Sequence, residues 1–360
     1  MISLARPIIG RDEIAAVLRV LRSGNLAQGP EVKAFEEEFA KVHNSFYAVA
    51  VNSGTSALHL SLLAAGVGPG DEVLVPSFSF AATANVVKLV GANPVFVDIE
   101  KNYYCMDADD LRSKITSKSK AIIPVHLYGQ ICDMKIINQV AYEFDLVVIE
   151  DAAQSHLASL DGKPAGTWGN FACFSFYPTK NMTTGEGGMI LCKTEEDARK
   201  LRLLRNQGME KRYENEVFGY NNRMTDISAA IGRVQLRKLQ KWTFKRNKNA
   251  AFLCEHLKGV IVPEIRPNSS HSFHQFTVLL QPNVNRENVI ERLSNLGVSS
   301  SVYYPTPIHR LPSFKLNLDL PVTEDVATRC LSLPVHPKLS RQDLKRIVSS
   351  VNSITGSFQN

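Results

Sequence analysis

The sequence predicts an α/β protein, built as a three-layer, mostly parallel sheet with helices on both faces, followed by a smaller C-terminal α+β domain. Strand-like apolar runs alternate with helical patterns up to residue 193, which is typical of βαβ units. The chain has 360 residues, more than one core usually organises, so two domains are expected. A long helical pattern from Thr225 toward Leu257 connects them, and we predict a large domain over 1–240 and a small one over 241–360.

The order of elements follows from the apolar patterns. Apolar side chains recur at helical spacing over 14–21 and again over 32–42, behind Pro30, so two helices precede the first strand. Helical runs such as SALHLSLLAAG, ATANVVKLVG and KIINQVAYEF then separate some of the strands. The predicted strands are AVAVNS, EVLVPSF, PVFVDI, AIIPVHL, LVVIED, FACFSF and GMILCK. Ligands bind at the carboxyl ends of such strands, so the residues that follow them are expected to share one pocket.

Beyond the long helix, the pattern changes to that of a small α+β unit. Strand-like FHQFTVLL precedes helical ENVIERLSNLG, strand-like VSSSVYYP follows, and a last helix is predicted near DLKRIVSSVNSI.

Composition and charge narrow the class of protein. The content is 44% hydrophobic and 21% charged, which is ordinary for a globular protein, and no apolar run is long enough to span a membrane. The net charge is +6, but Lys and Arg alternate with acids and no nucleic-acid module is recognisable. Six scattered cysteines form no metal-like cluster and are interpreted as buried, reduced thiols. We therefore expect a cytoplasmic protein without metal, membrane or nucleic-acid partners.

Lys180 and Asp151 indicate the chemistry. Lys180 lies in FSFYPTKNMTTGEGG, on a predicted turn between two strands, and Asp151 ends the apolar run LVVIED. A lysine amine can form a Schiff base with pyridoxal 5'-phosphate (PLP), while a buried aspartate keeps the pyridine nitrogen protonated. Most lysines are merely solvated, and the flanking apolar run, Pro178 and the glycines are what favour a functional role here.

A phosphate site is predicted at NSGTSALHLSLL. Ser53 to Ser56 lie between a strand and a helix, where backbone N–H groups and hydroxyls suit a phosphate. Taken alone, such residues are more often an ordinary helix cap than a phosphate site.

Long segments of the chain resemble the DegT/DnrJ/StrS family of sugar aminotransferases, which have the fold type I of PLP-dependent transferases. They include NSGTSALHLSLL, VIEDAAQSH, CFSFYPTKNMTTGEGGM and GYNNRMTDISAAIG. The resemblance implies that Lys180 is the Schiff-base lysine and Asp151 the partner of the pyridine nitrogen. It further implies cofactor-binding roles for Gly54, Thr55, Phe80, Gln154, Ser175 and Asn221, the last of these reaching the phosphate from a neighbouring subunit. A homodimer with shared active sites is expected.

The resemblance also implies the reaction. Glutamate would give its amino group to PLP, leaving pyridoxamine 5'-phosphate, which would then aminate a nucleotide-linked keto sugar. The segments SGNLAQG and KRYENEVFGYNNRMTDI are most similar to perosamine-synthase-type members, which favours a 4-keto-6-deoxyhexose. A 3-keto sugar or keto-cyclitol aminotransferase and a non-catalytic regulatory protein with this fold are the alternatives. Family dehydratases have histidine in place of Lys180, so lysine indicates transamination.

Fewer residues indicate the substrate side. Tyr304 and His309, in VYYPTPIH, resemble a substrate-flanking loop, although a lone histidine is as often structural. Leu157 replaces a glycine of the family pattern, and we expect it to reshape the floor of the pocket.

Overall fold

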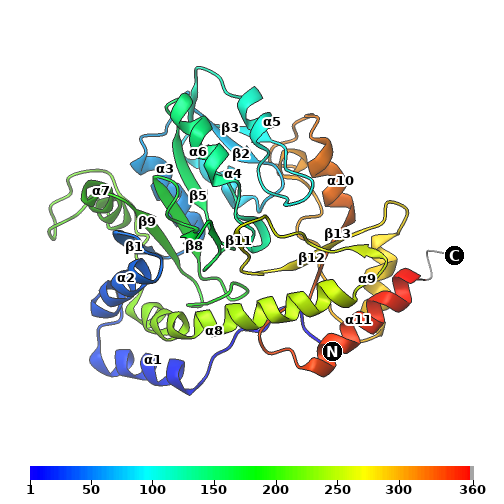
Figure 1. Cartoon of the computed structure of the whole chain (residues 1–360). Coiled ribbons are helices and arrows are strands. Elements are labelled where there is room, and N and C mark those ends of the chain that lie inside the picture. Colours follow the sequence, from blue (N-terminus) through cyan, green and yellow to red (C-terminus); the bar gives the residue numbers. More distant parts are fainter. Residues whose placement is uncertain (357–360) are drawn as a thin grey trace.

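A seven-stranded sheet forms the centre of the molecule (Figure 1), as seen in the computed structural model, which describes residues 1–356. Its spatial order is β1-β9-β8-β5-β4-β2-β3. The strands are β1 (Tyr47–Val51), β2 (Glu72–Pro76), β3 (Asn93–Val97), β4 (Ser119–Ile122), β5 (Val147–Asp151), β8 (Phe171–Ser175) and β9 (Gly188–Cys192). β9 is antiparallel to its neighbours β1 and β8, and the other pairs are parallel. The predicted mostly parallel sheet is confirmed, while the reversed direction of β9 was not predicted.

Helices cover both faces of this sheet, so the predicted three layers are present. Alternate residues of the strands enter different cores, as the two-residue period of a strand requires. One core contains residues of α3 (Gly54–Ala64), α4 (Ala82–Leu89) and α7 (Glu195–Arg205). On the opposite face, two clusters contain residues of α2 (Pro30–Val42), α5 (Ala108–Ser113), α6 (Met134–Glu143) and α8 (Asp226–His256).

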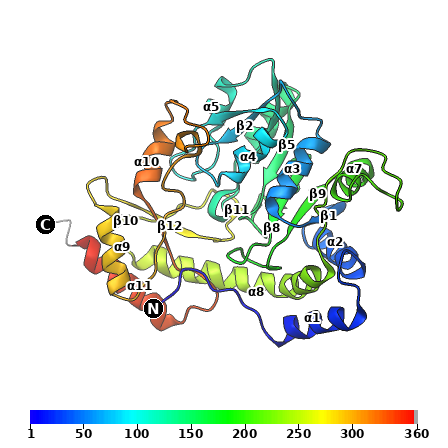
Figure 2. The same cartoon turned by 180° about the vertical axis from the view of Figure 1, so that it is seen from behind.

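The long helix α8 matches its sequence prediction closely. The Thr225 hydroxyl accepts a hydrogen bond from Ser228 N–H at 3.2 Å and caps its start, because the first N–H groups of a helix have no partner within it. α8 runs from the large sheet to the C-terminal part of the molecule, and α1 (Arg11–Ser23) packs against it (Figure 1). Seen from behind, the N-terminal segment follows α8 from the C-terminal part toward α1 (Figure 2).

A three-stranded sheet organises the C-terminal part. It has the order β10-β12-β13, and its core includes residues of the helices that flank it. These elements are β10 (Val260–Ile261), β12 (Phe276–Leu280), β13 (Cys330–Leu333), α9 (Arg286–Asn295) and α11 (Arg341–Thr355). The proposed boundary at 240/241 falls inside α8, and the division into domains stays a prediction.

Short elements complete the fold. VSSSVYYP forms no strand, contrary to the prediction, and makes two isolated bridges, Val298 with Ile2 and Ser301 with Ser332. A third small sheet has the order β11-β6-β7. The remaining elements are β6 (Ser159–Leu160), β7 (Lys163–Pro164), β11 (Ser269–Ser270), α10 (Pro321–Arg329) and the 3-10 turns η1 (Leu127–Gly129) and η2 (Ile308–Arg310).

The six cysteines are free thiols, buried except for the half-buried Cys254. Within residues 1–356, no helix combines the length and apolarity needed to cross a membrane.

Candidate functional site

A cavity of about 820 Å³ lies at the carboxyl ends of the parallel strands. This volume is in the range of small-molecule sites, and the position is the one expected for ligands of an α/β sheet. All the predicted site residues except Asn221 and His309 line it, namely Gly54, Thr55, Phe80, Asp151, Gln154, Ser175, Lys180 and Tyr304. Residues from four strand ends therefore meet in one place.

Asp151 is the last residue of β5, and its carboxylate is buried. Oδ2 accepts a hydrogen bond from the Thr83 hydroxyl at 2.9 Å, and Oδ1 accepts one from Ala153 N–H at 3.2 Å. Burial raises the pKa of Asp151, while these hydrogen bonds and the charge of Lys180 oppose the rise. A buried carboxylate with spare acceptor capacity can hold a cationic N–H group.

Lys180 is positioned by the segment that connects β8 to β9. Its backbone N–H donates to Tyr177 O at 2.9 Å, which makes the turn that the sequence predicts. The side chain is half-buried in the wall of the cavity. Burial lowers the pKa of the Lys180 amine to about 8, although the charge of Asp151 opposes this. A lysine amine with a pKa this close to neutrality can serve as nucleophile and base.

The orientation of the Gln154 amide is fixed by its two hydrogen bonds. Oε1 accepts from Tyr128 N–H at 2.7 Å, and Nε2 donates to the Tyr304 hydroxyl at 3.2 Å. Tyr128 has a φ of 58°, in the left-handed region of backbone conformation, which is energetically costly for a residue with a side chain. The N–H group that binds Gln154 Oε1 belongs to this residue. The strained backbone thus directs the amide N–H of Gln154 into the cavity beside Tyr304.

The start of α3 and the end of β8 form a narrow cradle. A Cβ added to Gly54 would lie 2.8 Å from Ser175 Cβ, so only glycine allows this approach. The Ser53 hydroxyl accepts from Ser56 N–H at 3.0 Å, and the first intrahelical bond runs from Ala57 N–H to Ser53 O. The N–H groups of Gly54 and Thr55 precede that bond, so they are available to an anion at the helix start.

Phe80 is 60% exposed although its ring lines the cavity and lies 6.1 Å from the ring of Tyr304. A large aromatic side chain in this setting offers an uncovered flat face, which suits a planar ligand ring.

The structure places Asn221 and His309 outside this cavity. Asn221 is exposed at the base of the loop 206–222. His309 is fully buried, with Nδ1 2.6 Å from the Ser77 hydroxyl and Nε2 3.2 Å from Glu324 Oε1. These contacts favour the structural alternative for His309.

Leu157 does not line the cavity, so the expected reshaping of the pocket floor is not observed. Its side chain packs against the core cluster that contains Phe174 and Phe176. Its φ is 62°, which explains why glycine suits this position.

Sequence reasoning missed several residues of the cavity wall. Thr83 carries the hydroxyl that binds Asp151, and its only sequence signal is a threonine at the start of the helical pattern that follows a strand. The other residues that it missed include Tyr177, Glu186, His274 and Gln275.

The donor set fits PLP. Lys180 and Asp151 lie in one cavity, the glycine cradle at α3 presents N–H groups and hydroxyls for a phosphate, and the flat face of Phe80 is uncovered. The buried Asp151 carboxylate supplies the acceptor that a protonated pyridine nitrogen requires.

The chain is similar to known aminotransferases. Residues 7–352 match the model of the DegT/DnrJ/EryC1/StrS aminotransferase family. A UDP-N-acetyl-3-dehydro-alpha-D-glucosamine 3-aminotransferase of Acidithiobacillus ferrooxidans is 40% identical over 95% of this chain and 93% of its own. GDP-perosamine synthase of Caulobacter vibrioides is 39% identical over 98% of both chains. The crystal structure of S. venezuelae DesV with a ketimine intermediate has a TM-score of 0.92 at 37% identity, covering 95% of this chain and 94% of that one.

Proposed function

This chain belongs to the DegT/DnrJ/EryC1/StrS aminotransferase family and is a PLP-dependent sugar aminotransferase, and from that premise we propose that it transfers an amino group from glutamate to a nucleotide-linked 4-keto-6-deoxyhexose. The observation that carries the sugar class is the match to GDP-perosamine synthase over 98% of both chains. The aromatic wall formed by Phe80, Tyr303 and Tyr304 supports it, since an apolar surface suits the methyl group of a 6-deoxy sugar.

In the proposed site, Gly54, Thr55 and Ser175 would hold the phosphate, Asp151 the pyridine nitrogen and Phe80 the ring face. When bound, PLP supplies an electron-accepting ring conjugated to its aldehyde, so that a carbon next to the reacting amine can lose its proton. Lys180 would take and return that proton, because burial leaves a sizeable fraction of its amine neutral near pH 7 to 8. Gln154 would donate a hydrogen bond from Nε2 to the oxygen on the ring.

The runner-up acceptor is a 3-keto sugar. It is favoured by the 40% identity to the UDP-N-acetyl-3-dehydro-alpha-D-glucosamine 3-aminotransferase. The two relatives are almost equally similar in sequence. We therefore choose between the 4-keto and the 3-keto sugar by the share of each chain that the match covers and by the aromatic wall of the cavity.

The homodimer is part of the proposal. The base of the loop 206–222 borders the phosphate end of the cavity, since Asn52 N–H donates to Asn222 O at 2.9 Å. A second copy related by a two-fold axis near this point would bring its own Asn221 to the phosphate. Phe218, in the same loop, is 100% exposed, which is unusual for a phenylalanine that has no partner. A cytoplasmic location and the absence of nucleic-acid partners stay predictions.

The test is a half-reaction series. Protein loaded with PLP is treated with glutamate, desalted, and mixed with nucleotide-linked 4-keto and 3-keto sugars while the visible absorbance is followed. We expect glutamate to bleach the PLP absorbance and a 4-keto-6-deoxy sugar to restore it fastest. Faster recovery with the 3-keto sugar would select the runner-up, and no response to glutamate or any other amino donor would contradict the proposal.

A further inference from the structure

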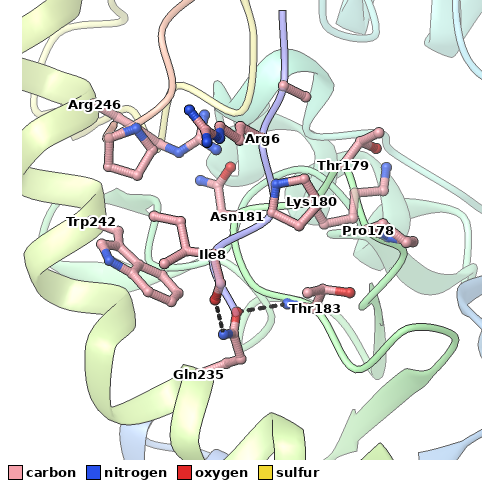
Figure 3. A pocket seen from close by; sticks show the side chains of 13 residues that line it. Arg6, Ile8, Pro178, Thr179, Lys180, Asn181, Thr183, Gln235, Trp242 and Arg246 are labelled. Atoms are coloured by element: carbon pink, nitrogen blue, oxygen red, sulfur yellow. Dashed lines mark hydrogen bonds between the residues drawn. The ribbon is translucent and has the colours of Figure 1, made fainter. Parts of the chain in front are cut away.

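A second, much smaller cavity adjoins the Lys180 segment (Figure 3), and it shares Thr179 and Lys180 with the main cavity as lining residues. Its volume is about 20 Å³, which is room for about one water molecule. The walls come from four parts of the chain: the N-terminal segment 5–8, the segment 178–183, α8 and Pro337. It therefore lies where segments far apart in sequence support the catalytic lysine.

Gln235 of α8 holds these walls together. Its Nε2 donates to Ile8 O at 2.7 Å, and its Oε1 accepts from Thr183 N–H at 3.3 Å, as the dashed lines show (Figure 3). Because one buried amide binds both segments, the cavity between them has a defined shape.

Two buried polar atoms of the cavity wall have no hydrogen-bond partner within residues 1–356. One is Arg246 Nε, whose side chain is only 6% exposed and whose Nη1 already donates to Phe273 O and His274 O at 3.0 and 3.2 Å. The other is Asn181 Oδ1, whose side chain is 4% exposed. Figure 3 shows the Asn181 amide directed toward the guanidinium groups of Arg6 and Arg246.

The hydrogen bond of the Asn181 amide shows whether water or an anion suits the small cavity. Nδ2 donates to Ser272 O at 2.9 Å, so the remaining polar atom is an acceptor, whereas Arg246 offers a donor. A water molecule can accept from one and donate to the other, and buried waters bridge such groups. The basic lining of Arg6, Lys180 and Arg246, without an acid, would attract a small anion, but an anion would face the lone pairs of Asn181 Oδ1.

We propose that Arg246 is a positioning residue for Lys180 and acts through one ordered water, which accepts from Arg246 Nε–H and donates to Asn181 Oδ1. Asn181 directly follows Lys180, so this link fixes the backbone next to the reactive amine. This inference about Arg246 depends on the proposed function only in the experiment that measures PLP dissociation.

The direct test is a high-resolution crystal structure of the holoenzyme, from crystals soaked in sodium bromide. We expect a single peak within hydrogen-bonding distance of both atoms and without anomalous signal. An anomalous bromide peak would show an anion site instead, and the absence of any peak would also overturn the proposal. This outcome does not depend on the identity of the sugar substrate.

A double-mutant cycle tests the link in solution. Arg246→Lys keeps the charge but has no Nε–H, and Asn181→Leu removes the acceptor. Arg246→Lys also removes the bonds to the two carbonyl groups, and Asn181→Leu also removes the bond to Ser272 O. The double variant lacks the same bonds, so their contributions cancel in the cycle. We expect the increase in the rate of PLP dissociation in the double variant to be roughly fivefold smaller than the product of the two single increases.

Additive effects would refute the link. The free energy of unfolding of the same four proteins gives a second cycle, which decides the question even if PLP binding proves not to be the function. Thr243→Val is the matched control, because Thr243 Oγ1 is another unpartnered buried atom of α8 but lies outside the cavity. Its effect should combine additively with each of the other two substitutions.

Discussion

The surroundings of Lys180 set its protonation, and this has a consequence for stability. Burial lowers the pKa of the amine from 10.5 to about 8 in the folded protein. Between these values the unfolded chain binds more protons than the folded one, so stability rises with pH across this window. Below about pH 8 the folded protein carries the charge of Lys180 in a site that removes it from much of its water, which is unfavourable.

Lys180→Met should therefore stabilise the PLP-free protein at pH 7.5, and its advantage over the wild type should shrink as the pH rises toward 10.5. Urea unfolding at several pH values measures this difference. Lys101→Met, at an exposed position, serves as the control and should leave the pH slope unchanged. A constant difference between Lys180→Met and the wild type would mean that the fold does not perturb this amine.

Thr83 is predicted to tune Asp151. Its hydroxyl donates to Asp151 Oδ2 at 2.9 Å and lowers the pKa of that carboxyl. Thr83→Val removes the donor with little change in shape, so the pKa of Asp151 should rise and activity should fall on the acidic side at a higher pH than in the wild type. We expect a loss of kcat/KM of about tenfold to a hundredfold, since a hydrogen bond to a charged group contributes roughly 1.5–3 kcal/mol.

Thr83→Ser keeps the hydroxyl and should retain the wild-type acidic limb in the same pH–rate profile. If the valine and serine variants had identical profiles, the hydroxyl would have no electrostatic role.

At the residue scale, the sequence predicts the lysine and the aspartate that PLP chemistry requires. It does not predict the neighbouring residues that hold the site residues in position. Lys180 and Asp151 could be found because few residue types can do their work and both follow strands. The bond from Thr83 to Asp151 and the strained Tyr128 backbone that directs Gln154 depend on contacts across the fold. His309 could not be assigned, because only the structure shows its buried contacts with Ser77 and Glu324.

At the scale of elements, the contact of α3 with β8 should be the most sensitive part of the phosphate cradle. Gly54→Ala would place a methyl group 2.8 Å from Ser175 Cβ, which forces the helix start away from the strand. We expect a loss of about 1–3 kcal/mol in unfolding free energy from overpacking. The affinity for PLP should also fall, because the N–H groups of the helix start and the Ser175 hydroxyl move apart. Urea unfolding of the PLP-free protein and equilibrium titration with PLP measure the two effects.

Gly68→Ala is the control for this substitution, because a Cβ there would meet no atom within 4 Å. It should leave PLP affinity unchanged and stability equal or slightly increased, as replacing glycine restricts the unfolded chain. Wild-type PLP affinity in Gly54→Ala would show that the cradle adapts.

The elements were predicted where a long periodic pattern exists and missed where context decides. α8 begins and ends within a residue of its predicted limits, because its pattern is long and Thr225 caps it. GMILCK is recognisable as a strand, but only pairing with β1 and β8 shows that it runs antiparallel. β13 has four residues directly after α10, too few for a distinct pattern. VSSSVYYP has strand composition but makes only isolated bridges, to Ile2 and to β13.

At the scale of the whole molecule, the position of Asn221 bears on whether one chain or two chains form the active site. The loop that carries it is closed at its base, where Gln207 N–H donates to Tyr220 O at 2.8 Å and Asn222 N–H to Arg205 O at 3.0 Å. Asn221 is therefore held outside its own cavity, and in the proposed homodimer it would contact the phosphate of the other copy.

This arrangement predicts complementation between two inactive variants. Lys180→Ala lacks the amine, and Asn221→Asp puts a carboxylate against the phosphate of the partner's site, where like charges repel. In a mixed dimer, one site combines the intact Lys180 of one protomer with the intact Asn221 of the other. Each mixed dimer has one intact site of two, so the purified mixed species should recover about half of the wild-type activity. Co-expression of the two variants with different tags, followed by purification of the mixed species and assay, measures this recovery. Dimers that remain inactive after mixing would show that Asn221 serves its own chain or none.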